Sequence, residues 1–132
     1  MNRLAWAAAF FLTADLSAVE LILVDERSDA QALVPAVDNG GSLLGESWKN
    51  VTDPANIADW QAGLTGIGYD TSNGDRYRPL IGIDVEQMRT EVGSVFIRVP
   101  FRVEAPDLAM IQALTLRMKY DDGFVAWING VR

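Results

Sequence analysis

The residues of this chain that could do chemistry are carboxylates and tryptophans, because its 132 residues include no cysteine and no histidine. A disulfide framework, a Cys/His zinc site and a Ser-His or Cys-His nucleophile pair therefore cannot be built from this chain alone. Asp121 and Asp122 form one acidic pair directly before Gly123. Because hard cations bind clustered oxygens, the pair is a candidate ligand-binding or calcium site. The Asp-Asp-Gly sequence is also typical of a hairpin turn, which is the favoured interpretation.

A second oxygen cluster consists of Asp70, Asn73 and Asp75 within one polar segment. These residues do not match the spacing of an EF-hand loop. Asn73 precedes Gly74, and Asn, Asp and Gly together favour a solvent-exposed turn. The sequence therefore leaves structural calcium as the one cofactor to test, with a solvated turn as the favoured interpretation, and it indicates no other metal or cofactor.

Among the aromatic residues, Trp127 is the candidate for a ligand contact. In a strand over residues 124–128 it lies on the face opposite Phe124. If that face is exposed, the indole can stack on a sugar ring; the alternative is a tryptophan buried between two sheets. Trp48 and Trp60 pose the same choice, with anchoring of a loop favoured. A glycoside hydrolase needs two carboxylates about 5–10 Å apart across a cleft, and the sequence singles out no such pair.

The composition indicates a folded, acidic chain of one domain. Hydrophobic residues make up 49% and charged residues 22% of the chain, which excludes a disordered protein. The net charge of −7 and the pI near 4.4 argue against nucleic-acid binding, which needs a basic surface. They also argue against attraction to anionic membranes. We therefore expect partners other than nucleic acid, and no membrane span.

Residues 1–18 have the pattern of an export signal. Arg3 provides a positive start, residues 4–12 are an unbroken apolar run, and residues 16–18 offer a small-residue cleavage site. The run is too short to cross a bilayer. The alternative is a buried N-terminal helix. With export, the mature chain comprises residues 19–132, and we expect it in an extracellular, cell-surface or periplasmic location.

Short strands separated by turn residues account for most of the remaining chain. Alternation of apolar and polar residues, together with β-branched side chains, predicts an all-β fold, an antiparallel β-sandwich. Residues 42–64 are expected to be irregular. The expected strands cover residues 19–24, 31–37, 65–69, 95–103, 114–120 and 124–128.

Proline and glycine positions refine this prediction. Pro35 and Pro100 donate no ladder hydrogen bond, so their strands end nearby or lie at a sheet edge. Gly66 and Gly68 share one face of a short strand, since side-chain directions alternate. Two glycines on one face indicate that another backbone or a ring packs closely there.

The last residues of the sequence predict a hairpin turn. Asn129-Gly130 favours a type I′ turn, in which both central residues have positive φ. Only Val131 and Arg132 follow, whereas a hairpin needs a returning strand. We therefore expect residues 19–132 to be the N-terminal part of a β-sandwich module that is incomplete at its C-terminus. An exposed apolar face or an unpaired edge next to residues 124–128 is the expected consequence.

Several motifs, taken in order, resemble those of a known family. They are Leu33-Val34-Pro35, Trp48, Asp59-Trp60, Thr65-Gly66-Ile67-Gly68-Tyr69-Asp70, Leu80-Ile81-Gly82, Val95-Phe96-Ile97-Arg98-Val99-Pro100-Phe101, and Lys119-Tyr120-Asp121-Asp122-Gly123-Phe124-Val125-Ala126 with Asn129-Gly130. This pattern resembles the galactose-binding-like jelly-roll module of large exported bacterial proteins, especially those of planctomycetes and verrucomicrobia. There the module accompanies lamin-tail and CotH-kinase-like domains. The chain departs from the family in having a single acidic residue before Trp60 and in lacking the strands that follow the Asn-Gly turn.

The resemblance implies a jelly-roll fold and a non-catalytic module at the N-terminus of a bacterial surface protein, with a role in interaction or spacing. It implies glycans, other cell-surface components or downstream domains of the same polypeptide as partners. A carbohydrate-binding module is the first alternative, and a carboxylate- or metal-dependent hydrolase module is the second. A fold by itself does not establish a ligand.

Overall fold

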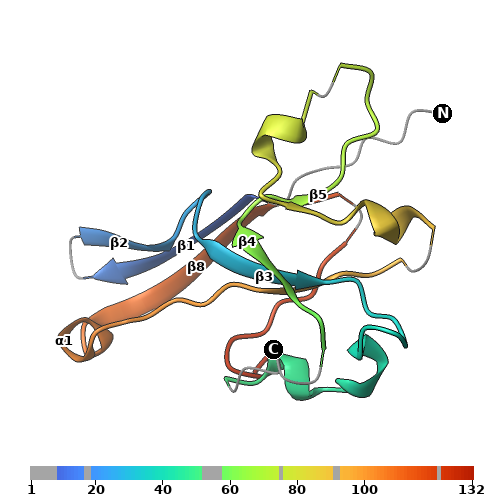
Figure 1. Cartoon of the computed structure of the whole chain (residues 1–132). Helices are drawn as coiled ribbons and strands as arrows, with labels where there is room; N and C mark the ends of the chain where they lie inside the picture. The colour runs from blue at the N-terminus through green and yellow to red at the C-terminus, as the bar shows by residue number, and fades with distance from the viewer. Residues whose placement is uncertain (1–8, 17–18, 52–57, 75, 91–92, 122) are drawn as a thin grey trace.

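The computed structural model describes residues 9–16, 19–51, 58–74, 76–90, 93–121 and 123–132 (Figure 1). Within these residues the fold is all-β, with two antiparallel three-stranded sheets, as the sequence predicts. No helix in this part of the chain is long and apolar enough to cross a membrane. The helical segments are α1 (Ala105–Leu108) and the short 3₁₀ helices η1 (Gly41–Leu43), η2 (Ser47–Lys49), η4 (Arg78–Leu80) and η5 (Glu86–Arg89).

The first sheet has the strand order β2-β1-β8, and both neighbouring pairs are antiparallel. β2 (Val19–Val24) lies where the sequence predicts a strand, and β8 (Ile111–Lys119) begins three residues earlier than expected. Apolar residues of β1 and β8 lie opposite each other and share one face of the sheet. These pairs are Phe10 with Met118, Leu12 with Leu116 and Ala14 with Leu114.

β1 (Ala9–Leu16) is the middle strand of this sheet, in the segment where the sequence predicts an export signal. The alternative of a buried N-terminal helix is wrong for these residues, because they pair with β2 on one side and β8 on the other. An apolar run suits either a helix or a strand, and the available ladder partners decide between them. Residues 1–8 and 17–18 lie outside the described part, so the export signal stays a prediction.

The second sheet has the order β4-β3-β7, again antiparallel. β3 (Asp29–Leu33) ends two residues before Pro35, and β7 (Phe96–Arg98) is an edge strand that ends before Pro100, so both proline predictions are confirmed. β4 (Gln61–Leu64) falls in the segment predicted to be irregular. Its short sequence shows no alternation, and it becomes a strand because β3 offers it a partner edge.

Two short strands form a parallel pair beside these sheets: β5 (Ile67–Gly68) and β6 (Ile83–Asp84). Gly66 has a φ of +95°, and a Cβ atom on it would collide with the carbonyl oxygen of Leu80. The predicted close approach of another backbone to this glycine segment is therefore confirmed.

Replacing Gly66 by alanine should lower the free energy of unfolding by more than the roughly 1–3 kcal/mol that an unfavourable φ costs. Gly74 is the matched control, because its φ is +97° and a Cβ atom on it would meet nothing within 4 Å. Urea denaturation of Gly66→Ala and Gly74→Ala separates the cost of the unfavourable φ, which both variants share, from the cost of the collision with Leu80, which only Gly66→Ala has. Equal destabilisation by both substitutions would show that the Leu80 carbonyl group does not crowd Gly66.

Two buried clusters lie on opposite sides of β3. On one side Ala30, Ala32 and Val34 pack with β5, β6 and Val85, and the partly buried Val95, Ile97 and Val99 contact this cluster. On the other side Leu33 packs with Leu44 and Ala58. Successive β3 residues enter different clusters because side chains alternate across a strand.

Candidate functional site

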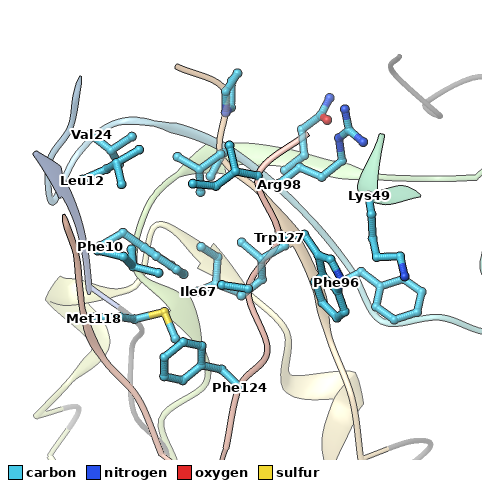
Figure 2. A pocket seen from close by; sticks show the side chains of 18 of the residues that line it. Phe10, Leu12, Val24, Lys49, Ile67, Phe96, Arg98, Met118, Phe124 and Trp127 are labelled. Atoms are coloured by element: carbon cyan, nitrogen blue, oxygen red, sulfur yellow. The ribbon is translucent and has the colours of Figure 1, made fainter. Parts of the chain in front are cut away.

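A wide trough opens between the residues of the two three-stranded sheets, with a volume of about 2610 Å³ (Figure 2). Most of its lining is apolar and comes from strands far apart in the sequence. We define the trough by side chains of the first sheet, of β5 and the second sheet, and of the C-terminal segment. They are Phe10, Leu12, Val24, Leu114, Leu116 and Met118, then Ile67, Phe96 and Ile97, and finally Tyr120, Phe124, Val125, Trp127 and Ile128.

The apolar side chains of β8 and of the C-terminal segment remain partly open to solvent. Leu114 is 38% exposed, Leu116 is 41% exposed and Phe124 is 46% exposed. Val125 and Ile128 are exposed to a similar degree. The predicted exposed apolar face next to residues 124–128 is therefore confirmed. Exposed contiguous apolar surface of this kind marks interaction sites in soluble proteins.

The C-terminal segment turns as predicted but does not form the predicted strand. Asn129 has a φ of +50° and Gly130 a φ of +82°, and an antiparallel bridge joins Ile128 to Val131. In the described residues no ladder extends along 124–128 beyond the single Ile128–Val131 bridge. Phe124 and Trp127, predicted on opposite faces, therefore both line the trough (Figure 2).

Trp127 is half-buried within an aromatic cluster at one end of the trough. Its ring meets the edge of Trp48 with centroids 5.4 Å apart and an interplanar angle of 78°. The Lys49 ammonium group lies 4.7 Å from the Trp127 centroid, in a cation–π contact. Lys49 also forms an ion pair with Glu46. A sugar that stacked on this face of Trp127 would have to displace the Lys49 ammonium group.

Trp48 connects this cluster to the second sheet. Its ring stacks on Phe96 with centroids 4.4 Å apart. The Arg98 guanidinium donates hydrogen bonds to the backbone oxygens of Trp48, at 2.5 Å, and Asn50, at 3.0 Å. Trp48 and Trp60 both pack on the Leu33 cluster, so their predicted role as loop anchors is confirmed. The buried Trp60 indole N–H has no hydrogen-bond partner among the described residues.

Asp70 organises the polar loop and lies away from the trough lining. Its Oδ1 accepts hydrogen bonds from the Ser72 hydroxyl, at 2.6 Å, and the Ser72 backbone N–H, at 2.8 Å. Its Oδ2 accepts from the backbone N–H groups of Tyr77, at 2.6 Å, and Arg78, at 3.1 Å. These bonds, led by the one from the Ser72 hydroxyl, lower the pKa of Asp70 to about 2.

The hydrogen bonds of Asp70 also bear on the calcium hypothesis. Both carboxylate oxygens face N–H or O–H donors, whose positive ends disfavour a bound cation. Asn73 is exposed at the turn, and Asp75 lies outside the described residues. Asp70 therefore acts as a clamp of the loop, and this geometry gives calcium no support.

The clamp predicts an acid-sensitive contribution to stability. The folded-state pKa of about 2 lies below the usual 3.8, so the contribution is complete above about pH 4 and is lost as the pH falls towards 2. Asp70→Asn should lower the melting temperature by several degrees at neutral pH, and the difference from wild type should shrink between pH 4 and 2. Asp38→Asn, in an exposed loop, is the control. A difference that stayed constant down to pH 2 would contradict the role of the charged carboxylate.

The other acidic candidates do not form a cluster among the described residues. Asp121 is exposed at the end of β8 and lines the trough, as does Asp29 of β3. Asp122 lies outside the described residues. Within the described ranges no group of three or more Asp, Glu, His or Cys side chains is placed to hold a metal ion.

The sequence interpretation missed several residues of this site. Lys49 belongs to no motif, and only its position next to Trp48 indicates a shared site; Arg98 lies within one of the family-like motifs, but that motif assigns it no role in a site. The sequence pattern places Phe10 and Leu12 in an export signal. The usable strand signal within this run is the alternation of Leu12, Ala14 and Leu16 with Thr13 and Asp15.

Comparison with known proteins adds no relative. No protein-family model, no curated protein and no solved structure matches the chain.

Proposed function

We propose that this chain is a non-catalytic β-sandwich module of the galactose-binding-like jelly-roll type, carried by an exported bacterial surface protein, with a role in interaction or spacing. The all-β fold and the motif resemblance support the module type. The pattern of residues 1–18 supports export. The expected partners are glycans or other cell-surface components.

The observation that best supports an interaction role is the open trough. Small-ligand pockets enclose roughly 300–1,000 Å³, whereas the trough has about 2610 Å³. Its lining is mostly apolar, and Asp29 and Asp121 reach it from separate elements. A broad apolar surface suits a macromolecular partner better than a small substrate held between catalytic acids.

The non-catalytic assignment is tested with the full chain and a panel of chromogenic glycosides, esters and phosphate esters, each with and without Ca²⁺. We expect no turnover above the buffer rate. Turnover that Asp121→Asn abolishes, and Asp38→Asn leaves unchanged, would replace this proposal by the carboxylate- or metal-dependent hydrolase. Cell fractionation followed by immunodetection tests export, and recovery of all the protein in the cytoplasm would contradict it.

A carbohydrate-binding module is the second candidate, because the Trp127 indole is only half-buried at the trough end, and a sugar that stacked on it would displace the Lys49 ammonium group. If glycans bind there, Trp127→Ala should weaken retardation in affinity gels by at least about tenfold, equivalent to about 1.4 kcal/mol. Tyr120→Ala is the control, since Tyr120 is another exposed aromatic residue of the trough. No retardation of the wild-type protein by any glycan would eliminate this candidate.

A further inference from the structure

β8 combines an apolar face that is partly open to solvent with a backbone edge, over residues 113–119, along which the described residues form no ladder and which we call the free edge. The opposite edge of β8 pairs with β1. Leu114, Leu116 and Met118 point from β8 into the trough. Backbone N–H and C=O groups along such an edge are a template for another strand. A sugar or a small molecule cannot satisfy both a row of backbone groups and a long apolar face.

The opposite face of β8 is basic. Side chains alternate across a strand, so Arg117 and Lys119 point away from the trough. Both are exposed, and the only ion pair that the described residues show for them joins Arg117 to Glu20 of β2 at 3.7 Å. A strand added beside β8 would therefore meet an apolar surface on one side and two cations on the other. Opposite charges on neighbouring strands stabilise such pairing.

We propose that the free edge of β8 and the trough bind an extended segment of a partner polypeptide whose residues alternate between apolar side chains and carboxylates. The apolar side chains enter the trough, the carboxylates face Arg117 and Lys119, and the two backbones form a ladder. The proposal rests on the interaction role proposed above and names the partner for that role.

Charge decides between this partner and a second copy of the chain. Two β8 strands joined edge to edge would carry Arg117 and Lys119 of both copies on one face of the joined sheet. Like charges placed on neighbouring strands destabilise such pairing. An alternating acidic segment instead brings carboxylates to the basic face of β8.

The test uses the full 132-residue chain and three labelled peptides that have the nine-residue length of β8. One alternates Leu or Val with Glu, the second replaces Glu by Lys, and the third is the acidic peptide with alternate backbone nitrogens methylated. Fluorescence anisotropy should show micromolar binding of the first peptide, weakening with salt. Binding of the second and third should be at least about tenfold weaker, because one has the wrong charge and the other lacks ladder donors.

Charge reversal at Lys119 localises the interaction. Lys119→Glu should weaken binding of the acidic peptide at least about tenfold and should strengthen binding of the basic peptide. Arg89→Glu, on η5 outside the trough lining, changes the net charge equally and should leave both affinities unchanged. Circular dichroism checks that both variants fold.

Several results would overturn the proposal. They are equal binding of acidic and basic peptides, full binding of the methylated peptide, no peptide binding, or self-association of the chain that Lys119→Glu abolishes. Absence of peptide binding, with no enzymatic turnover and with export intact, would remove this partner and leave the proposed module in place. Turnover of a chromogenic substrate would instead remove the proposed function itself.

Discussion

Removal of residues 1–18 should abolish cooperative unfolding of this chain at 25 °C. β1 supplies Leu12, Thr13 and Ala14, which are 6%, 4% and 0% exposed. It is also the strand that joins β2 to β8, so its loss leaves both without their ladder partner. Because a whole domain is stable by only about 5–15 kcal/mol, a missing central strand is a loss of comparable size.

Urea denaturation followed by circular dichroism compares the chain 19–132 with the full chain. A chain that lacks only residues 1–8 is the control, since it keeps β1 and should unfold cooperatively. A cooperative transition of 19–132 at the midpoint of the full chain would show that β1 is dispensable.

The predicted export signal, residues 1–18, contains β1, so its cleavage would remove this strand. N-terminal sequencing of protein recovered outside the cell shows whether β1 is retained. If Val19 is the first residue, the exported protein lacks β1, and β2 and β8 lose the ladder partner that they have in this structure.

Truncation of Leu33 to alanine should cost about 2–5 kcal/mol of unfolding free energy, the usual range for a fully buried leucine. Leu33 is 2% exposed and packs with Leu44, Ala58 and the two anchoring tryptophans. The neighbouring structure cannot collapse into the vacated space without moving large indole rings, which favours the upper part of the range.

Leu116→Ala is the matched control for this measurement, because it removes the same atoms from a trough residue that is 41% exposed. We expect a loss near 1 kcal/mol, since a partly exposed side chain has less transfer free energy to lose and leaves no closed cavity. Urea denaturation of both variants gives the comparison. Equal losses would mean that the trough is filled in solution, and the open face described above would be wrong.

The local features of this protein follow from its sequence. The β-branched run 19–24 becomes β2, the Asn129-Gly130 turn takes positive φ at both residues, and Pro35 lies just beyond the end of its strand. These features follow from φ restrictions and from the alternation of side chains, which act within a few residues.

Which segments pair as neighbouring strands depends on the fold of the whole chain. The apolar run of residues 9–16 suits an export signal, a helix or a strand, and the edges of β2 and β8 select the strand. β4 has no local signal and depends on β3. The predicted strand 124–128 shows the converse, since its β-prone side chains form no ladder among the described residues beyond the Ile128–Val131 bridge.

The features of the candidate site also fall into those that the sequence predicts and those that require the folded chain. Composition showed which residue types were present, and so it excluded Cys/His chemistry before any fold was known. The contact of Lys49 with Trp127 and the clamp on Asp70 required the folded chain. Lys49 and Trp127 are far apart in the sequence, and the backbone donors to Asp70 are in position only when the loop turns back towards this carboxylate. Contacts of this kind arise when a particular backbone path is closed, and that path is set by long-range strand pairing.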